Sequence, residues 1–430
     1  MYVGRLSLQS FRSYPNLDMA LEPGITTLVA PNGVGKTNLI EAIGYLSVLG
    51  SHRVSSDAPL ITVGKETALV RAQVLRASRQ AVLEVSINAK GANKARINRV
   101  EARPRELLGL LSTVIFAPED LSIVKGDPGE RRRFLDGLLV SRRPRLAGVM
   151  RDYEKALRQR NALLKSARGQ RWTDTHETTL SVWDDTLARA GGQIIASRLA
   201  LIEELTAPLR EAYGQISGAS QEHRRGIAMS YSSPVADAAG GVSARGTGLP
   251  DVTAGAGAGP ATGSAAEAPS EQPAVPDTAQ AAEARTSPGG ARNAAQELAE
   301  ALKAEYARLR RAERERGLTL AGPHRDDVDL RVGETPVKGF ASHGESWSFA
   351  LGLKLAAWEL HKADSPDPHD WPVLILDDVF AELDRHRRAR LAALVADAEQ
   401  LLITAAVEED LPEELGGRRV QVIPGGVADA

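Results

Sequence analysis

The sequence predicts an α/β fold whose two halves are separated by a largely helical insertion. A glycine-rich loop, Ala30-Pro31-Asn32-Gly33-Val34-Gly35-Lys36-Thr37, follows an apolar strand near the N-terminus. An acidic strand end, Val373-Leu374-Ile375-Leu376-Asp377-Asp378, lies near the C-terminus. Amphipathic helical periodicity occupies long segments between the two. We therefore expect one nucleotide site to be assembled from the two ends of the chain.

Composition narrows the class of protein. A length of 430 residues predicts two or three domains, and a hydrophobic content of 43% is ample for a sizeable core. The net charge is only -2, so any contact with nucleic acid must use local basic patches rather than a uniform field. The absence of cysteine excludes disulfides and thiolate metal sites. The sequence has no signal peptide or membrane-spanning stretch, so we expect a cytoplasmic protein without membrane association.

The two ends of the chain have the pattern of a strand-rich lobe. A strand, a glycine-rich loop and a helix follow one another at 25–46, which is the context that a phosphate loop requires. Alternation over 66–87 predicts a hairpin. Further strands are predicted at 2–11, 113–116, 328–332, 372–376, 400–404 and 420–423, and further helices at 343–361 and 383–396.

The middle of the chain is predicted to be helical. Apolar residues recur at helical spacing from Leu146 to Leu164 and from Leu180 to Leu209, which indicates two packed helices. Residues 235–292 are dominated by Ala, Gly, Ser, Pro, Thr and Glu, a composition that predicts disorder. The predicted domains are 1–117 (first half of the ATPase lobe), 118–234 (helical second lobe), 235–292 (disordered insertion), 293–320 (returning helix) and 321–430 (second half of the ATPase lobe).

The phosphate loop predicts binding of ATP with Mg²⁺. Glycines allow backbone N–H groups to approach phosphates without a Cβ clash, and the following helix adds its positive end. Lys36 would reach the β- and γ-phosphates, and Thr37 would place its hydroxyl on Mg²⁺. The usual pattern begins with glycine, where this chain has Ala30. Alanine can serve there if its φ is negative.

The acidic strand supplies the other half of the site. Four apolar residues bury the strand, and carboxylates emerge at its C-terminal end, where open α/β sheets bind ligands. Asp377 would hold Mg²⁺ directly or through a water. Asp378 would be the catalytic residue that polarises or deprotonates the attacking water, with Lys36 on the phosphates.

A third motif predicts that the site is completed by a second copy of the chain. Ser342, Gly344 and Glu345 open a helix just before the acidic strand, where Ser342 and the Gly344 backbone could grip a phosphate. A Leu-Asp turn, Ala381-Glu382-Leu383-Asp384, follows the strand. This order is typical of ABC-type ATPases, in which the serine motif of one subunit caps the nucleotide bound by the other. Taken singly, each motif could be a helix cap or a turn.

Several charged residues have open interpretations. Arg53 could reach the γ-phosphate or form a surface ion pair. Arg131, Arg132 and Arg133 follow a Pro-Gly helix start and could contact the phosphates of DNA, although a solvated helix face is the alternative. Glu119 could act on Mg²⁺ or water, or simply belong to a turn.

Taken together, the motifs resemble the RecF family of bacterial recombination mediators over nearly the whole chain apart from the 235–292 segment. The residues that carry the resemblance are Phe11-Arg12-Ser13-Tyr14, Asn32 to Asn38, Ser51-His52-Arg53, Phe116 to Leu121, Gly126-Asp127-Pro128, Arg131 to Asp136, Gln159-Arg160-Asn161, Gly322 to Asp327, and Leu376 to Asp384.

The resemblance implies an ABC-type P-loop ATPase head with a second, largely helical lobe inserted between the Walker A half and the signature and Walker B half. It implies nucleotide binding by residues 30–38 and Arg53, ATP-dependent homodimerisation, and weak DNA-stimulated ATP hydrolysis. The implied partners are single-stranded and gapped duplex DNA, RecR and RecO, and through them RecA, in recombinational repair, replication restart and the SOS response.

The signature departs from the family pattern. His343 and Glu345 stand where glutamines are usual, and Trp347 stands where a polar or basic residue is common. Ser342 and Gly344 remain, so phosphate capping is still expected, but control of the dimer is in question. The alternative functions are a chromosome-organising ATPase of the SMC type and another ABC-type ATPase without a mediator role. The chain has no room for the long coiled coils of the first.

Overall fold

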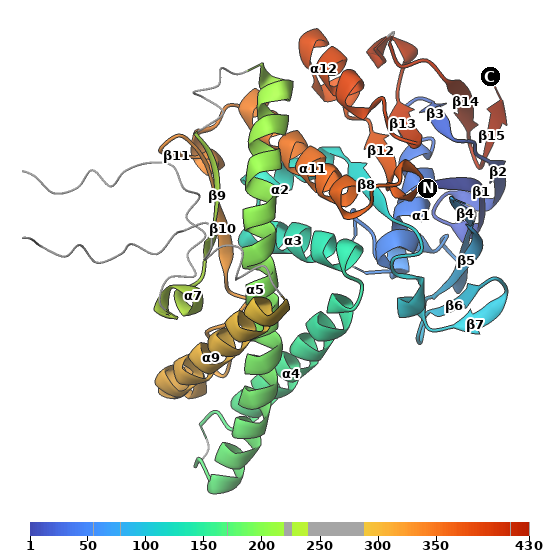
Figure 1. The fold of residues 1–430 in the computed structure, drawn as a ribbon. Coiled ribbons are helices and arrows are strands. Elements are labelled where there is room, and N and C mark those ends of the chain that lie inside the picture. Colours follow the sequence, from blue (N-terminus) through green and yellow to red (C-terminus); the bar gives the residue numbers. More distant parts are fainter. Residues whose placement is uncertain are drawn as a thin grey trace, which may run out of the picture.

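The computed structural model describes residues 1–54, 56–77, 79–169, 171–218, 226–239, 288–412 and 414–429. They form two lobes that lie side by side (Figure 1). The ATPase lobe contains both chain ends and two six-stranded sheets. The helical lobe contains the long helices and a three-stranded sheet.

The first sheet of the ATPase lobe is mainly parallel and is ordered β15-β14-β3-β13-β12-β8. Strands β3, β13, β12 and β8 run parallel, although they come from both ends of the sequence. Their carboxyl ends therefore meet at one edge, where ligands bind in open α/β sheets. The strands are β3 (Gly24–Val29), β8 (Thr113–Phe116), β12 (Val373–Asp377), β13 (Gln400–Ala405), β14 (Arg418–Ile423) and β15 (Gly426–Asp429).

The second sheet is antiparallel and is ordered β2-β1-β4-β5-β6-β7. Helix α1 (Lys36–Val48) shares one apolar core with residues of both sheets, including Leu6, Ile40 and Ile375. The phosphate-loop helix is thus held between the two sheets. The strands are β1 (Tyr2–Phe11), β2 (Tyr14–Ala20), β4 (Thr67–Arg76), β5 (Arg79–Asn88), β6 (Lys94–Ile97) and β7 (Val100–Ala102).

The opposite face of the parallel sheet is covered by α11 (His343–Asp364) and α12 (Arg385–Val395). Leu351 and Trp358 of α11 pack there with Leu376 of β12. The same helix sends Phe349 and Leu353 into the core of the helical lobe. Helix α11 is therefore the element through which the two lobes share their packing.

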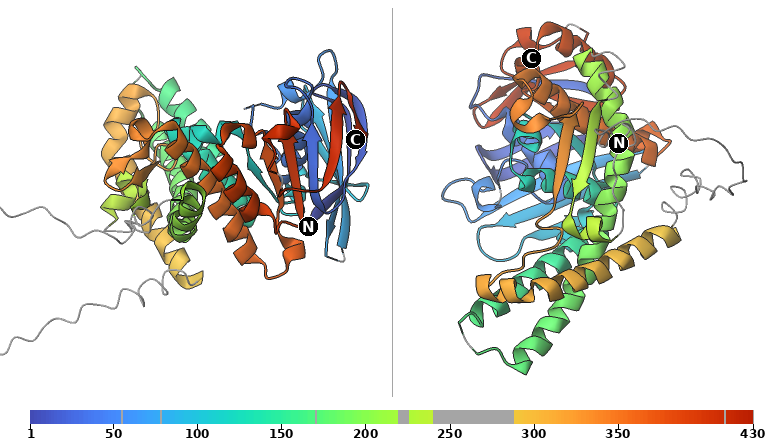
Figure 2. Two further views of the ribbon diagram at one scale, coloured as in Figure 1. Left: turned by 90° about the horizontal axis from the view of Figure 1, so that it is seen from above. Right: turned by 90° about the vertical axis from the view of Figure 1, so that its left-hand side faces the viewer.

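The helical lobe is organised around α5 (Asp174–Ser217), a helix of 44 residues. Helix α4 (Leu146–Ser166) runs beside it, and α9 (Pro288–Arg316) crosses it, as the right-hand view of Figure 2 shows. The tip formed by α4 and α5 extends as an arm beyond the rest of the molecule (Figure 1). The shorter helices are α2 (Leu121–Lys125), α3 (Pro128–Arg142), α7 (Pro234–Ala238) and α10 (Val337–Phe340).

The chain returns to the ATPase lobe later than the sequence predicts. Strand β10 (Asp327–Val332) was expected within the ATPase lobe, because 321–430 was assigned to its second half. It instead pairs with β9 (Ile227–Ser232) and with β11 (Thr335–Pro336). Val328 and Leu330 belong to the apolar core of the helical lobe. Pairing with β9, which lies about 100 residues earlier in the chain, therefore decides where β10 packs.

The segment predicted to be disordered, 235–292, lies mostly outside the described residues. Its first and last parts are described, and the prediction was wrong for both. Val235 and Ala236 are buried in α7, whose Ser233 cap accepts a hydrogen bond from the Ala236 N–H. At the other end, α9 begins at Pro288, upstream of the predicted start near 294. At the first of these ends, packing of Val235 and Ala236 in the core of the helical lobe compensates for the composition. Within the described part of the chain, every helix is too short or too polar to cross a membrane.

Candidate nucleotide-binding site

The phosphate loop joins β3 to α1 and depends on two glycines with left-handed backbone. Gly33 has φ 85° and Gly35 has φ 126°. A Cβ on Gly35 would lie 2.9 Å from the Ser13 hydroxyl and 3.0 Å from the Tyr14 hydroxyl. Ala30 is absent from the described residues with positive φ, so its methyl group is compatible with the loop. This explains why the loop tolerates alanine at the position where glycine is usual.

Lys36, the first residue of α1, folds back over the loop. Its ammonium donates to the Ala30 carbonyl at 2.9 Å and to Asn32 Oδ1 at 3.2 Å, and the residue is only 4% exposed. Asp378 Oδ1 lies 3.7 Å from the same ammonium. A buried cation held mainly by neutral oxygens can still gain from an anionic ligand.

Thr37 and Asp377 come together from opposite ends of the chain. The Thr37 hydroxyl lies 3.1 Å from Asp377 Oδ1, and the Thr404 hydroxyl donates to the same oxygen at 2.6 Å. Burial raises the pKa of Asp377 to about 6, because the charged form loses its hydration; the nearby Asp378 charge adds to the effect. A cation beside this carboxylate would reverse the shift.

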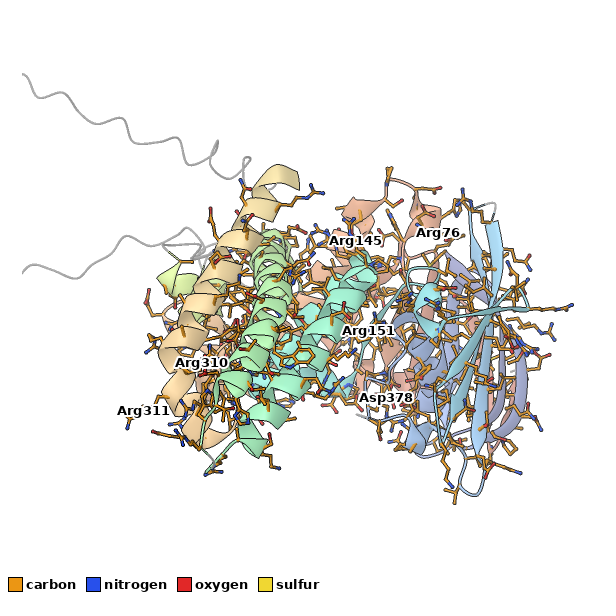
Figure 3. All side chains as sticks on the ribbon, turned by 90° about the horizontal axis from the view of Figure 1, so that it is seen from below. Arg76, Arg145, Arg151, Arg310, Arg311 and Asp378 are labelled. Carbon is orange, nitrogen blue, oxygen red and sulfur yellow. The ribbon has the colours of Figure 1, made fainter. Side chains whose placement is uncertain are left out.

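Asp378 has the least satisfied side chain at the site. Its backbone is left-handed, with φ 50°, and its N–H donates to the Thr404 hydroxyl at 2.9 Å. Its Oδ1 atom is buried without a hydrogen-bond partner. Figure 3 shows Asp378 where the ATPase lobe borders the helical lobe. A strained residue with an unpaired buried oxygen is typical of a site that is completed by a ligand.

The oxygen atoms gathered here suit Mg²⁺. A hydroxyl from Thr37 and a carboxylate from Asp377 are the hard ligands that this ion prefers, alongside water and phosphate. The described residues contain no cluster of three or more His, Cys, Asp or Glu side chains that could hold a metal alone. The site therefore fits a metal that arrives with a nucleotide rather than one held by protein ligands only.

Arg53 lies beside the phosphate-loop helix and is one-third exposed. Its guanidinium donates to Asn38 Oδ1 at 3.2 Å and lies 3.6 Å from buried Glu41 and 3.7 Å from Glu119. Arg12 also binds Glu41, at 2.6 and 2.9 Å. The structure thus brings Arg53 and Glu119 together, as two charges at the edge of the site.

Two residues in this region carry no role in the sequence prediction. Thr404 binds both Asp377 and Asp378, and the signal that could have found it is its place at the carboxyl end of β13 beside the acidic strand. Lys354 of α11 forms an ion pair with Asp120 at 2.9 Å. No local sequence pattern indicates this pair, because its members lie more than 200 residues apart.

The signature motif forms the N-terminus of α11. Ser342 is the exposed N-cap residue; its hydroxyl accepts from the Glu345 N–H at 3.3 Å, and Glu345 accepts from the Ser342 N–H at 2.9 Å. A Cβ on Gly344 would lie 2.7 Å from an Arg387 nitrogen. Trp347 is 2% exposed and packs under the parallel sheet. The residue at the unusual position therefore contributes to the core rather than to the exposed surface of the motif.

The three arginines predicted to contact DNA are mostly unavailable. Arg131 is buried and binds Asp327 at 2.7 and 2.9 Å. Arg132 donates to the Asp326 carbonyl at 2.6 Å, and burial lowers its pKa. Arg133 is exposed but forms an ion pair with Glu130. The prediction is wrong for Arg131, because its buried side chain attaches α3 to β10. For the half-buried Arg132 and the exposed Arg133 it stays a prediction.

Comparison with known proteins identifies the family. Residues 2–420 match the family model described as the RecF/RecN/SMC N terminal domain. The chain is 49% identical to the DNA replication and repair protein RecF of Arthrobacter sp. (strain FB24), over 100% of this chain and 99% of the relative. It is 46% identical to the RecF protein of Streptomyces avermitilis, with 99% of each chain covered. The chain belongs to the RecF family.

Solved structures of RecF agree on the fold. The chain superposes on the recombination mediator protein RecF with ATP, with a TM-score of 0.77 and 24% identity, covering 100% of this chain and 97% of that one. The ATPrS form of RecF in the RecFOR pathway gives a TM-score of 0.76, also at 24% identity, with 100% and 98% covered. The predicted ABC-type head with its helical second lobe is thereby confirmed as the fold.

Proposed function

We propose that the protein is an ATP-dependent DNA clamp that acts as a recombination mediator in the cytoplasm. ATP would bind with Mg²⁺ at the edge of the parallel sheet, and two copies would close head to head around the nucleotides. Slow ATP hydrolysis, stimulated by single-stranded or gapped duplex DNA, would release the clamp. By family, the partners would be RecR and RecO, which help to load RecA in repair, replication restart and the SOS response.

Each residue of the site has a part in this proposal. The loop 30–37 would surround the phosphates with backbone N–H groups, and Lys36 would turn from Ala30 to the β- and γ-phosphates. Thr37 and Asp377 would hold Mg²⁺, which supplies positive charge against the phosphate oxygens. Asn38 and Arg53 would line the γ-phosphate side.

Hydrolysis and closure would use the remaining residues. Asp378 would orient a water and accept its proton, since its Oδ1 makes no hydrogen bond within the protein. The exposed Ser342, with Gly344 and Glu345 at the start of α11, would cap the nucleotide bound by the second copy. The observation that carries the proposal is the buried Asp378 Oδ1, which lies 3.7 Å from the Lys36 ammonium and has no hydrogen-bond partner.

The test compares ATP-dependent dimerisation of the wild type with that of Lys36→Met. Sedimentation velocity should show a dimer with ATP for the wild type and a folded monomer for Lys36→Met. The matched control is Lys65→Met, which removes a lysine from an exposed loop and should dimerise normally. A Lys36→Met protein that dimerises with ATP like the wild type would contradict the proposed role of the site.

A further inference from the structure

Helix α4 has two faces of different chemistry. Tyr153, Ala156 and Leu164 are buried, and α4 packs with this face in the core that α5 shares. On the other side of the helix, Arg151, Lys155, Arg158 and Lys165 are all exposed. Their spacing of four, three and seven residues keeps them on one face, because a helix turns by about 100° per residue. The row covers about 21 Å of the helix axis at 1.5 Å per residue.

The charge of this region contrasts with that of the chain. Between 143 and 168, seven exposed or part-exposed cations stand against two acids, although the whole chain has a net charge of -2. The eighth cation, Arg160, is buried in a separate cluster. The exposed residues are Arg143, Arg145, Arg151, Lys155, Arg158, Lys165 and Arg168, and the acids are Asp152 and Glu154.

Most of these cations could bind a phosphate group. Three of them have an acidic neighbour. Arg151 lies 3.8 Å from Asp152 and Arg158 lies 3.6 Å from Glu154, with the arginines 55% and 68% exposed. Arg143, which is 46% exposed, lies 3.5 Å from Glu204 of α5. Within the described ranges, Arg145, Lys155 and Lys165 have no carboxylate in ion-pair range. Exposed pairs of this kind contribute at most about 1 kcal/mol, so a phosphate can replace the acid.

The row faces the ATPase lobe. Helix α4 lies on the ATPase side of α5 (Figure 1), and Figure 3 shows Arg145 and Arg151 on the side of the helical lobe that looks toward the ATPase lobe. Arg310 and Arg311 lie on the outer side of the same lobe. The α4 cations are therefore directed to the space between the lobes.

The base of this space carries more positive charge. Gly109 of the ATPase lobe meets Pro144 at the turn before α4, because a Cβ on Gly109 would lie 2.9 Å from Pro144 Cγ. Exposed Arg143 and Arg145 flank Pro144. On the ATPase side, a short 3₁₀ helix, Pro104–Leu107, precedes Gly109; exposed Arg103 is its N-cap residue and exposed Arg105 lies within it. Cations from both lobes thus border one contact between them.

We propose that the exposed face of α4, with the arginines around Pro144, binds the phosphate backbone of duplex DNA. This inference rests on the proposed function as a DNA clamp and locates the surface that it needs. A row of about 21 Å matches roughly six base pairs at 3.4 Å each along one strand. Such contacts are independent of base sequence and sensitive to salt. Arg131, which is buried and bound to Asp327, cannot make them.

The experiment measures DNA affinity of the double variant Arg151→Gln/Lys155→Gln. Binding to a fluorescein-labelled duplex with a single-stranded gap is followed by anisotropy, with ATP, across a salt series. Loss of two phosphate contacts should weaken binding about tenfold at low salt and reduce the salt slope by about two. The charge-retaining variant Arg151→Lys/Lys155→Arg should bind DNA nearly like the wild type.

The matched control is Arg308→Gln/Arg311→Gln, which removes two exposed cations from α9, where Arg311 lies on the outer side of the same lobe. It should retain wild-type affinity; an equal loss would reveal a net-charge effect and overturn the proposal. The proposal is also overturned if Arg151→Gln/Lys155→Gln binds DNA with wild-type affinity. This holds even if that variant no longer binds a protein partner, because the surface would then serve that partner and not DNA. ATP-dependent dimerisation is measured in parallel: its failure in the wild type contradicts the proposed function, whereas normal dimerisation with unchanged DNA binding contradicts this inference alone.

Discussion

Two buried cations in this molecule have opposite surroundings. Arg160, in the helical lobe, donates to Asp184 at 2.7 Å, Thr319 at 2.8 Å and Glu313 at 2.6 Å, and its guanidinium lies 4.8 Å from the centre of the Tyr306 ring. Lys36, in the ATPase lobe, donates to a carbonyl and an amide oxygen, and its nearest carboxylate oxygen, Asp378 Oδ1, lies 3.7 Å away without a hydrogen-bond partner. The protein therefore supplies close anionic partners for Arg160, but it supplies none at hydrogen-bond distance for Lys36.

The difference separates architecture from a ligand site. Buried ionic groups stabilise a fold only when every partner is present, so the Arg160 cluster joins α4, α5 and α9 as a closed unit. An incomplete cluster costs stability in the free protein and recovers it when a ligand supplies the missing partners. The three predictions below test this contrast, beginning with the largest effect.

Arg160→Leu should destabilise the protein most. Glu313 is fully buried, and without the guanidinium its charge has no cationic partner at hydrogen-bond distance in the described structure. Breaking a buried pair in this way costs about 3–5 kcal/mol in the free energy of unfolding. Urea denaturation measures it, with Arg311→Leu as control, since Arg311 is 94% exposed and should change the free energy by less than about 0.5 kcal/mol. Equal losses in the two variants would mean that the Arg160 cluster is not a structural unit.

Asp377→Asn should change how stability depends on pH. Burial raises the pKa of Asp377 from 3.8 to about 6, so the folded chain holds a proton that the unfolded chain has released. Stability from this group is therefore greatest below about pH 4 and falls as pH rises to about 6, by about 3 kcal/mol. The asparagine variant should lack this fall.

The measurement is the unfolding free energy of both proteins, without nucleotide, from pH 4 to pH 7. Asp326 has a pKa raised to about 6 by burial, and its contribution cancels in the difference between the two proteins. If the difference in unfolding free energy between the two proteins does not vary from pH 4 to pH 7, Asp377 is ionised throughout this range. Burial of its charge would then cost less stability than the contrast with Arg160 requires.

Lys36→Met should have the smallest effect on stability. The methionine side chain keeps the apolar contacts of the lysine stem, and the Asp378 side chain is 29% exposed, so it can be hydrated. We expect a change within about 1.5 kcal/mol by urea denaturation, well below that of Arg160→Leu. ATP should stabilise the wild type and leave the variant unchanged. A loss as large as that of Arg160→Leu would remove the distinction between the two cations.

Much of the ATPase lobe could be predicted because its signals are local. The strand at 113–116 and the helix that follows the phosphate loop are where the sequence predicts them. The approach of Thr37 to Asp377 was also expected, since parallel strands place their carboxyl ends at one edge. The roles proposed for these residues stay predictions until nucleotide binding is measured.

The burial of the α3 arginines could not be predicted from the local sequence. Three consecutive residues span about 200° around a helix, so Arg131, Arg132 and Arg133 cannot share one face. Which of them is buried depends on β10, which arrives nearly 200 residues later and supplies Asp327 to Arg131. The α4 row differs, because its spacing of four and three residues is visible in the sequence once the helix is known. Only its direction toward the ATPase lobe needed the structure.

The sequence by itself determined the family, the phosphate loop, the acidic strand and the order of the elements around them. These features depend on residue types and spacings along a continuous stretch of chain. Only the tertiary structure decided that β10 joins the helical lobe and that Arg160 has all its partners while Asp378 Oδ1 lacks a hydrogen bond. It also decided that Arg131 of α3 is buried against Asp327 while the α4 row faces the ATPase lobe. Burial and pairing of charges depend on neighbours far away in the sequence, and those neighbours are fixed by packing.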